Sequence, residues 1–237
     1  MRINSRSPIS VCIATYNGEK YLWEQLVTLC EDLREYDEIV VSDNCSTDKT
    51  LEIVSRLQDG RIKVFTFEAQ GVNFNFENAI RHASNEYIFF CDQDDIWHPG
   101  KRDRCMEVLG GCDLLMHNAF VRGSASRRSQ LFESSVKLDI KSTIFVNKFT
   151  GCCMVGRRSF LLQCLPLPNK VPYFDQWIAV NAIARRVSYT FLNEALITHR
   201  RHDRNTSSLL KKSSQRVRHI ILQRLYLLFI FLKIRLK

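Results

Sequence analysis

The sequence predicts an α/β fold: a mainly parallel β-sheet flanked by helices, followed by a basic and apolar helical tail. Short apolar runs rich in β-branched residues alternate with segments of helical spacing, which is typical of βαβ units. Hydrophobic residues make up 45% and charged residues 25% of the 237 residues, as in a globular protein with one sizeable core. We therefore expect one domain over residues 1–208 and a tail over residues 209–237.

Strands and helices alternate regularly through the first part of the chain. Asn17-Gly18 ends the first strand, and the oxygen-bearing side chains of Ser46–Asp48 are expected to cap the second helix. The expected strands are Ile9–Thr15, Glu38–Ser42, Arg61–Phe67 and Tyr87–Cys91, and the helices between them are Glu19–Leu33, Lys49–Leu57 and Asn73–Ala83. In such a sheet, ligands bind beyond the carboxyl ends of the strands.

The second part of the chain is expected to continue the sheet with shorter elements. A polar segment, Arg122–Ser135, is predicted to be a mobile loop. The other expected elements are a helix from Pro99 to about Leu109, strands Cys112–Val121 and Phe149–Val155, helices Ser159–Leu165 and Asp175–Arg185, and strands Val187–Leu192 and Ala195–Thr198.

Cysteine usage and the N-terminal segment point to the cytosol. The nine cysteines are odd in number, show no C-x-x-C pair and lie mostly in apolar stretches, so we expect buried thiols in a reducing compartment. The first residues contain no long apolar segment of the kind found in a signal peptide. We expect a cytoplasmic protein.

Positive charge is concentrated in the tail. Residues 200–237 carry 11 Lys or Arg and one acid, which leaves 23 basic and 24 acidic residues for the rest of the chain. A nearly neutral body argues against a nucleic-acid-binding protein, whose basic residues line a folded face. The apolar run Leu225–Leu232 is too short to cross a bilayer as a helix, which needs about 20 residues. We expect the tail to lie on the inner face of the membrane, and the alternative is a helix docked on the body or on a second subunit.

Polar clusters follow three of the predicted strands. They are Thr15–Asn17, Asp43-Asn44 and Asp92–Asp95. Three carboxylates directly after a buried strand are costly unless a cation neutralises them, and carboxylate oxygens suit Mg²⁺ or Mn²⁺. The alternative is a solvated acidic turn that caps a helix, because Asp-x-Asp by itself is a common pattern. The position of the turn beside two other polar strand ends favours a metal site.

Five blocks of the sequence together resemble the family 2 glycosyltransferases of GT-A fold, in particular their rhamnosyltransferase-like branch. These blocks are Ile9–Gly18, Asp37–Thr50, Gly71–Phe76, Tyr87–Trp97 and Leu196–Asn205, and the resemblance covers most of residues 9–208. It implies a Rossmann-like GT-A sheet. It also implies an inverting enzyme of bacterial surface-polysaccharide synthesis that transfers a sugar, possibly rhamnose, from a nucleoside-diphosphate sugar to a glycan or lipid-linked acceptor.

The resemblance assigns residues to the donor. Asn44 aligns with the acid that contacts the base in the family; an amide offers both a donor and an acceptor, so the identity of the base stays open. Asn75 matches a residue that contacts the donor, and an amide exposed on the helix surface is an equally good interpretation of it. The residues assigned to the donor nucleotide and its diphosphate are Ala14, Thr15, Tyr16, Asp43, Asn44, Asn75, Asp92 and Arg200.

The resemblance also implies the metal ligands and the general base. Asp94 matches the main ligand of a divalent cation, with Asp92 and His202 beside it, whereas His199 replaces the tyrosine of the family's pattern. Inverting transfer requires a base that deprotonates the acceptor hydroxyl, and such proton transfer contributes roughly 10²–10⁴-fold. Asp175 matches this base, and the alternative is a helix cap.

Two other classes of protein remain as alternatives. A nucleotidyltransferase that makes sugar nucleotides shares a parallel sheet and an acidic metal site, but it normally has a glycine-rich basic loop after the first strand, which Thr15–Gly18 lacks. The second alternative is a non-catalytic membrane-binding module in which the tail carries the function.

Overall fold

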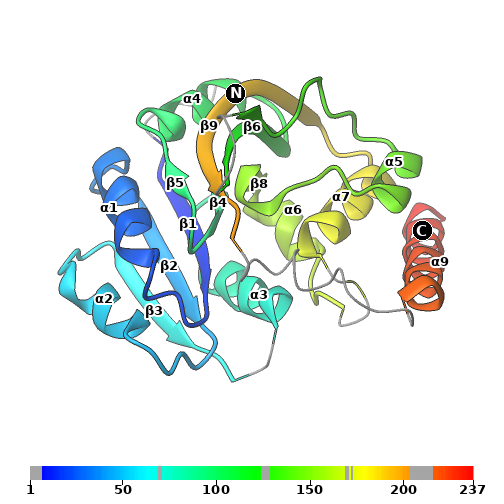
Figure 1. The fold of residues 1–237 in the computed structure, drawn as a ribbon. Coiled ribbons are helices and arrows are strands. Elements are labelled where there is room, and N and C mark those ends of the chain that lie inside the picture. Colours follow the sequence, from blue (N-terminus) through cyan, green and yellow to red (C-terminus); the bar gives the residue numbers. More distant parts are fainter. Residues whose placement is uncertain are drawn as a thin grey trace.

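A computed structural model describes residues 7–68, 71–123, 129–168, 171, 173–202 and 216–236. One central β-sheet carries helices on both of its faces, and a long C-terminal helix stands at the edge of the molecule (Figure 1). The predicted α/β class is therefore confirmed.

The sheet has nine strands and is parallel in its first half and mixed in its second. Its order is β3-β2-β1-β4-β8-β6-β9-β5, with β7 paired to β6. β8 runs antiparallel to β4 and β6, while β6 and β9 are parallel to each other. The strands are β1 Ile9–Thr15, β2 Glu38–Asp43, β3 Ile62–Thr66, β4 Tyr87–Asp92, β5 Ile96–Trp97, β6 Leu114–Arg122, β7 Ser129–Gln130, β8 Met154–Arg157 and β9 Tyr189–Arg200.

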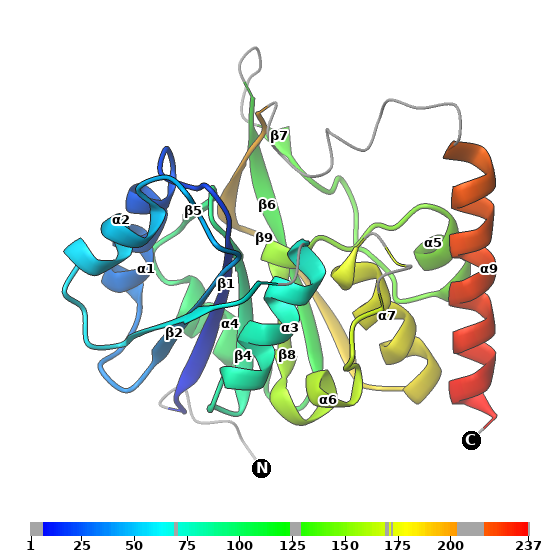
Figure 2. The same ribbon diagram turned by 90° about the horizontal axis from the view of Figure 1, so that it is seen from below.

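Helices cover the two faces because apolar side chains of the inner strands alternate between them. Along β1, Val11 and Ile13 pack under α1 and α4, whereas Cys12 packs under α3 on the other face. Figure 2 shows α3, α6 and α7 on the opposite side of the sheet from α1. The helices are α1 Leu22–Asp32, α2 Thr50–Arg56, α3 Val72–His82, α4 Lys101–Val108, α5 Ile140–Phe145, the 3₁₀ turn η1 Gly151–Cys153, α6 Arg158–Gln163, α7 Phe174–Arg185 and α9 Arg216–Arg235.

Several elements differ from their predicted form. The strand expected over Phe149–Val155 begins later, as β8, because η1 occupies the preceding residues. The two strands expected between residues 187 and 198 are one continuous strand, β9, in which a bulge opposite His117 and Asn118 absorbs the polar residues between them. Helix α5 was not predicted; Asp139 caps it by accepting a hydrogen bond from the Ser142 amide at 2.9 Å.

The predicted loop and the domain boundary are only partly described. Residues 129–130 of the expected loop Arg122–Ser135 form β7, and residues 124–128 lie outside the described part. The boundary at residues 208–209 also lies outside it. Of the nine cysteines, seven are buried as expected, Cys30 is half-buried, Cys45 is exposed, and none forms a disulfide.

Strand direction brings the functional segments together. β1, β2, β4 and β9 end at the same edge of the sheet, and the antiparallel strands β5 and β8 begin there. The acidic turn, residues 92–95, connects β4 to β5 at this edge, and η1 enters β8 beside it. The topology therefore places residues from six strand ends around one position, as the sequence predicted for the carboxyl ends.

Candidate active site

The acidic turn brings three carboxylates close together in surroundings that are partly closed to water. Asp95 is 1% and Asp94 8% exposed, while Asp92 is partly exposed at the end of β4. Loss of hydration and the neighbouring Asp95 and Asp94 carboxylates raise the pKa of Asp92 to about 8. Burial and Asp95 also raise the pKa of Asp94, although the nearby histidines oppose this. The turn therefore favours a bound cation.

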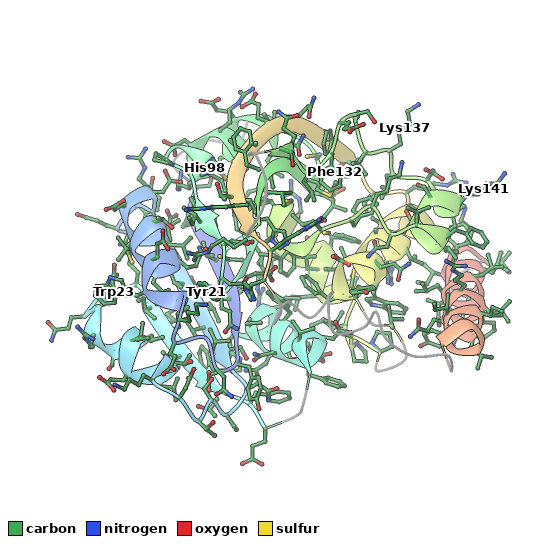
Figure 3. All side chains as sticks on the ribbon, in the orientation of Figure 1. Tyr21, Trp23, His98, Phe132, Lys137 and Lys141 are labelled. Carbon is green, nitrogen blue, oxygen red and sulfur yellow. The ribbon has the colours of Figure 1, made fainter. Side chains whose placement is uncertain are left out.

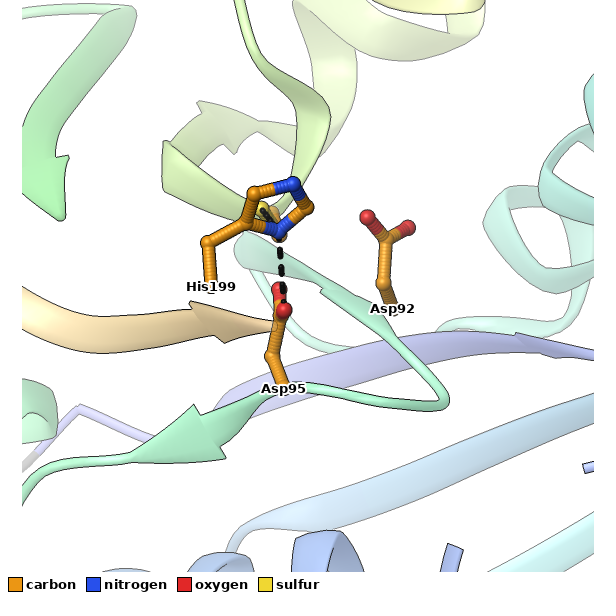
Figure 4. Close-up of side chains that lie close together, drawn as sticks. Asp92, Asp95 and His199 are labelled. Carbon is orange, nitrogen blue, oxygen red and sulfur yellow. Dashed lines mark hydrogen bonds and ion pairs between the residues drawn. The ribbon is translucent and has the colours of Figure 1, made fainter. Parts of the chain in front are cut away.

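Two histidines from the end of β9 and the residues that follow it contact this turn. His202 Nε2 lies 2.7 Å from Asp94 Oδ2, and its ring stacks on Tyr21 with centroids 4.6 Å apart. Tyr21, the residue before α1, points toward the sheet, whereas Trp23 in the first turn of α1 points away from it (Figure 3). His199 Nδ1 lies 2.9 Å from Asp95 Oδ1, beside Asp92 (Figure 4). Burial lowers the pKa of His199, but the Asp95 carboxylate outweighs this and raises it to about 9.

Arg200 holds the backbone of the acidic turn. Its guanidinium donates to the carbonyl oxygens of Asp94 and Asp95, and it pairs with Glu24 on α1. The guanidinium carbon also lies 4.8 Å from the centre of the Tyr21 ring. Arg200 thus fastens the turn to α1, and its expected contact with the donor diphosphate stays a prediction.

Gln93 joins the acidic turn to the turn after β1. Its side-chain oxygen accepts a hydrogen bond from the Tyr16 amide at 2.9 Å, and its nitrogen donates to the Tyr16 carbonyl at 3.1 Å. A Cβ atom on Gly18 would lie 2.4 Å from the Gln93 oxygen, so a larger residue there would displace the Gln93 amide from its hydrogen bonds with Tyr16. This contact joins residues 75 positions apart, so it is visible only in the folded chain.

The end of β2 is fixed by an internal hydrogen-bond network. Asp43 is fully buried and accepts hydrogen bonds from Thr15 Oγ1 at 2.8 Å and from Ser46 Oγ at 2.6 Å. Asn75, 2% exposed, donates to the Thr15 carbonyl at 2.9 Å and accepts from Ser42 Oγ. Asn75 is therefore not the helix-surface amide of the alternative interpretation. In this structure it positions the ends of β1 and β2, and its contact with the donor stays a prediction.

The remaining residues expected to bind the nucleotide lie at the same edge. Asn44 donates to the Phe67 carbonyl at 2.8 Å and accepts from the Gly71 amide at 3.2 Å, so its amide supports the neighbouring loop. Tyr16 is 58% exposed and Ala14 is partly exposed, paired with Asp92 across the sheet. Their roles toward a nucleotide stay predictions.

Asp175 begins α7 and is held from three directions. Its Oδ1 accepts from Asn147 Nδ2 at 3.2 Å and from the Gln176 amide at 2.6 Å, and its Oδ2 accepts from the Gly151 amide at 3.1 Å. Burial raises the pKa of Asp175 to about 6, although these hydrogen bonds lower it. The Asp175 charge in turn contributes to raising the pKa of Asp92, so the two carboxylates are close enough to repel each other.

The turn η1 connects Asp175 with the acidic turn. Gly151 bonds to Asp175, and the next residue, Cys152, places its sulfur 3.9 Å from His199 Nδ1. A Cβ on Gly151 would meet the Phe174 ring at 2.3 Å, so glycine lets the turn lie directly on α7. η1 thereby fixes the candidate base relative to the acidic turn.

Two aromatic residues beside Asp175 face the interior of the protein and not a sugar-binding surface. Phe174 packs in the core against Phe76 and Phe90, with centroids 4.1 and 5.1 Å apart. Trp177 is 7% exposed and donates from its indole to the Cys164 carbonyl at 2.7 Å. Both rings support the start of α7 from inside.

The residues at the acidic turn fit a divalent metal ion. The carboxylate oxygens suit Mg²⁺ or Mn²⁺, and the imidazole nitrogen beside them is accepted more readily by Mn²⁺ than by Mg²⁺. The raised pKa values of Asp92 and Asp94 reflect an excess of negative charge that such an ion offsets. Asp94 and His202 would hold it, with Asp92 alongside, and when bound it would stabilise the charge of a leaving diphosphate.

Comparison with known proteins decides the family. The model of glycosyl transferase family 2 matches residues 10–163. The chain belongs to this family. The match includes the ends of β1, β2 and β4 and the start of β8, which form part of the acidic edge of the sheet, whereas Asp175 and the end of β9 lie beyond it.

Curated relatives are family members from bacteria. WfgD of Escherichia coli, named as a UDP-Glc:α-D-GlcNAc-diphosphoundecaprenol β-1,3-glucosyltransferase, is 32% identical over 184 residues, 73% of this chain and 69% of its own. RfbG of Shigella flexneri, a dTDP-rhamnosyl transferase, is 34% identical over 105 residues, 41% and 36% of the two chains. An uncharacterized Nostoc glycosyltransferase is 28% identical over 172 residues, 67% and 53% of the two chains. The chain thus spans only about half of that relative's length.

Solved structures show the same fold. Residues 1–349 of Staphylococcus aureus TarS, in complex with UDP-GlcNAc, superpose with a TM-score of 0.73 at 22% identity, covering 91% of this chain and 66% of that one. The mannosyltransferase PcManGT of Pyrobaculum calidifontis, in complex with GDP-Man and Mn²⁺, gives a TM-score of 0.64 at 18% identity, covering 97% and 72%. The GT-A fold expected from the sequence is confirmed.

Proposed function

We propose that this protein is a metal-dependent, inverting glycosyltransferase that passes a sugar from a nucleoside-diphosphate sugar to a hydroxyl group. The observation that supports this best is a buried carboxylate, Asp175, whose charge reaches Asp92 of the acidic turn and whose partner Gly151 precedes Cys152, a neighbour of His199. One carboxylate is needed for the acceptor proton, and a separate charged site is needed for the leaving diphosphate. In this proposal Asp175, at the start of α7, takes the first part and the acidic turn takes the second.

Asp175 takes the part of the general base. Its carboxylate accepts the proton of the acceptor hydroxyl while that oxygen forms a bond to the anomeric carbon, and the bond from that carbon to the diphosphate breaks. Attack from the side opposite the leaving group inverts the anomeric centre. A pKa of about 6 leaves Asp175 ionised at neutral pH but basic enough to accept the proton.

The end of β9 and the acidic turn hold the donor. Asp94 and His202 provide the metal position, and Asp92, at the end of β4, lies beside the ends of β1 and β2 where the nucleoside is expected. Arg200 and Gln93 keep the turn in place from behind. Asn44 already forms hydrogen bonds with Phe67 and Gly71. We therefore propose that Tyr16 and Asn44 together recognise the nucleotide base, in place of a single acid.

The relatives indicate only the chemical classes of the donor and the acceptor. RfbG is named as a dTDP-rhamnosyl transferase, WfgD as a glucosyltransferase that acts on GlcNAc-diphosphoundecaprenol, and TarS as an N-acetylglucosaminyltransferase that acts on poly(ribitol phosphate). We propose that this chain also acts in surface-polysaccharide synthesis, with a glycan or a lipid-linked glycan as acceptor and rhamnose as one candidate sugar.

We also propose that α9 brings the enzyme to the cytoplasmic face of a membrane. One side of α9 docks on the body: Leu227 is 1% exposed, and Tyr226 stacks on Trp177 with centroids 6.4 Å apart. Its other side exposes an apolar stripe of 42–60% exposed residues, here called the outer face of α9: Ile221, Leu222, Leu225, Leu228, Phe229 and Leu232. In the described part of the chain, no helix is long and apolar enough to cross a membrane.

The outer face of α9 suits an anionic lipid surface better than a neutral one. Phe145 and Val146, at the end of α5, are 60% and 64% exposed. Arg224 of α9 donates a hydrogen bond to the Phe145 carbonyl at 2.8 Å. Phe145 and Val146 therefore add apolar surface next to α9. Residues 200–237 carry a net charge of +10 on an otherwise nearly neutral protein. Apolar contact together with basic charge is the combination that holds interfacial helices to anionic lipid.

The proposed reaction is tested by release of nucleoside diphosphate from a panel of nucleotide sugars with and without Mn²⁺. We expect release from at least one donor, dependent on the metal and abolished by Asp94→Ala. Release that is unchanged in Asp94→Ala would contradict the proposed role of the acidic turn.

A further inference from the structure

We propose a second metal site beside the first, formed by Asp92, Asp95, Cys152 and His199 and suited to Zn²⁺. One candidate ligand atom from each of the four residues lies within 4.8 Å of the other three. Neighbouring ligands of a tetrahedral zinc ion are about 3.3–3.8 Å apart, so shifts of about an ångström close the site. Asp94 and His202, which hold the donor metal in the proposed function, are not members of this cluster.

The ligand types distinguish the second site from the first. Cys152 provides a sulfur and His199 a ring nitrogen, 3.9 Å apart, and the two acids add oxygens. Thiolate and imidazole ligands select Zn²⁺ over Mg²⁺, which prefers oxygen ligands. An ion that binds here forms bonds to sulfur, nitrogen and oxygen and displaces the protons of Cys152 and of His199 to solvent.

An orphaned oxygen points to a missing ligand. Asp95 is 1% exposed, and its Oδ1 contacts His199, but its Oδ2 is buried and has no hydrogen-bond partner among the described residues. A buried carboxylate oxygen without a partner is costly, and a cation beside it removes that cost. Figure 4 shows the Asp95 carboxylate directed toward His199 with Asp92 to one side.

The route into the site passes the donor pocket. Cys152 and Asp95 form the closed side of the cluster, whereas Asp92 and His199 are partly exposed. An ion therefore enters from the side on which the sugar nucleotide is expected. Because Asp92 belongs to both sites, zinc in the second site competes with the donor for this carboxylate, and this consequence rests on the proposed function.

Cobalt provides a direct probe of thiolate ligation, because a cobalt–thiolate bond gives a charge-transfer band in the near ultraviolet. The full chain, freed of metal and carrying Cys45→Ser to remove its exposed thiol, is titrated with Co²⁺. We expect about one equivalent to give this band, and Zn²⁺ to bleach it. Excess Mg²⁺ should leave it in place.

Matched variants locate the site. Cys152→Ser and His199→Tyr should each weaken the band by roughly tenfold or more, whereas the neighbouring substitution Cys153→Ser and the donor-metal substitution Asp94→Ala should retain it. Circular dichroism checks the fold of each variant, and His199→Tyr gives the answer if Cys152→Ser does not fold. A band that is absent from the parent, or that survives both substitutions, overturns the second site.

The outcome is independent of the transfer reaction. A cobalt band without transferase activity supports the second site and contradicts the proposed function. Transferase activity without a cobalt band supports the proposed function and contradicts the second site. If both hold, micromolar Zn²⁺ should inhibit donor turnover in the parent, and His199→Tyr should relieve that inhibition. Inhibition of equal strength in both would contradict the competition at Asp92.

Discussion

His202 and Asp94, 108 residues apart in the chain, meet at 2.7 Å between Nε2 and Oδ2. Tyr21, the residue before α1, supports this pair by stacking on the imidazole ring. The contact joins the segment after β9 to the turn after β4. It thereby completes a donor set of oxygen and nitrogen at the edge where β1, β2 and β4 end.

Removing His202 should weaken metal binding without unfolding the site. His202→Ala deletes one metal ligand and leaves Asp94. We expect the Mn²⁺ concentration needed for half-maximal activity or thermal stabilisation to rise by about 10–100-fold. This is at least the effect of losing a residue that only supports a metal ligand. His82→Ala, on α3, is the matched control. Equal metal requirements in the two variants would exclude His202 as a ligand.

Asp175 should affect turnover much more than donor binding. Asp175→Asn keeps the shape of the side chain but removes the base, so we expect turnover to fall by roughly 10²–10⁴-fold with little change in donor affinity. The control is Asp139→Asn, which changes the acid that caps α5. Loss of donor binding in Asp175→Asn, or equal turnover in both variants, would argue for the helix-cap interpretation.

The pH dependence of turnover should report Asp175 directly. The base acts only when ionised, so activity should rise through a pKa of about 6 and level off above it. Asn147 donates to Asp175 Oδ1 and lowers this pKa, so Asn147→Ala should move the rise to higher pH. A pH profile of turnover under saturating donor measures the shift. A shift to lower pH would contradict the assignment.

The contact between Gly18 and Gln93 can be tested by a double-mutant cycle. Gly18→Ala places a methyl group against the Gln93 oxygen and pushes that amide off its hydrogen bonds with Tyr16, a loss of roughly 1 kcal/mol in the free energy of unfolding. Gln93→Ala frees that space, so Gly18→Ala should cost less in this background. Denaturant unfolding of the four proteins gives the coupling. Additive effects would show that the two residues do not interact in solution.

Membrane binding should depend on the outer face of α9. Leu225→Glu with Phe229→Glu places two charges on that face and should reduce co-flotation with anionic vesicles strongly. Leu51→Glu, on α2 at the far end of the molecule, is the control, and zwitterionic vesicles should bind the parent weakly. If Leu225→Glu with Phe229→Glu instead dissolves a dimer and leaves flotation unchanged, the face binds a second copy.

Much of the fold could be predicted because its signals are local. The alternation of apolar runs and helical segments predicted β1 to β4 and the helices between them, and the contiguous acids after β4 marked the edge where the site lies. Short elements set by tertiary contacts were missed. η1 depends on Gly151 lying against Phe174, and β9 continues through a bulge because β6 runs beside it.

Individual residues of the candidate site could be predicted only where the side chain itself can bind a metal ion or accept a proton. The acids and histidines could be proposed from the sequence, but what each one contacts could not. Asn75 and Arg200 support the site in ways that depend on partners far along the chain, and so does Gln93. The contact between His199 and Asp95 joins residues 104 positions apart, which only the folded sheet reveals.

A metal-dependent nucleotide pocket at the acidic turn is the central claim, and calorimetry tests it most directly. UDP, GDP, dTDP, CDP and ADP are each titrated into the protein with Mn²⁺ and with EDTA. We predict that at least one nucleotide binds with Mn²⁺, that EDTA weakens the binding, and that Asp94→Ala abolishes its metal dependence. If no nucleoside diphosphate binds, or if binding is the same in EDTA and in Asp94→Ala, the central claim is contradicted.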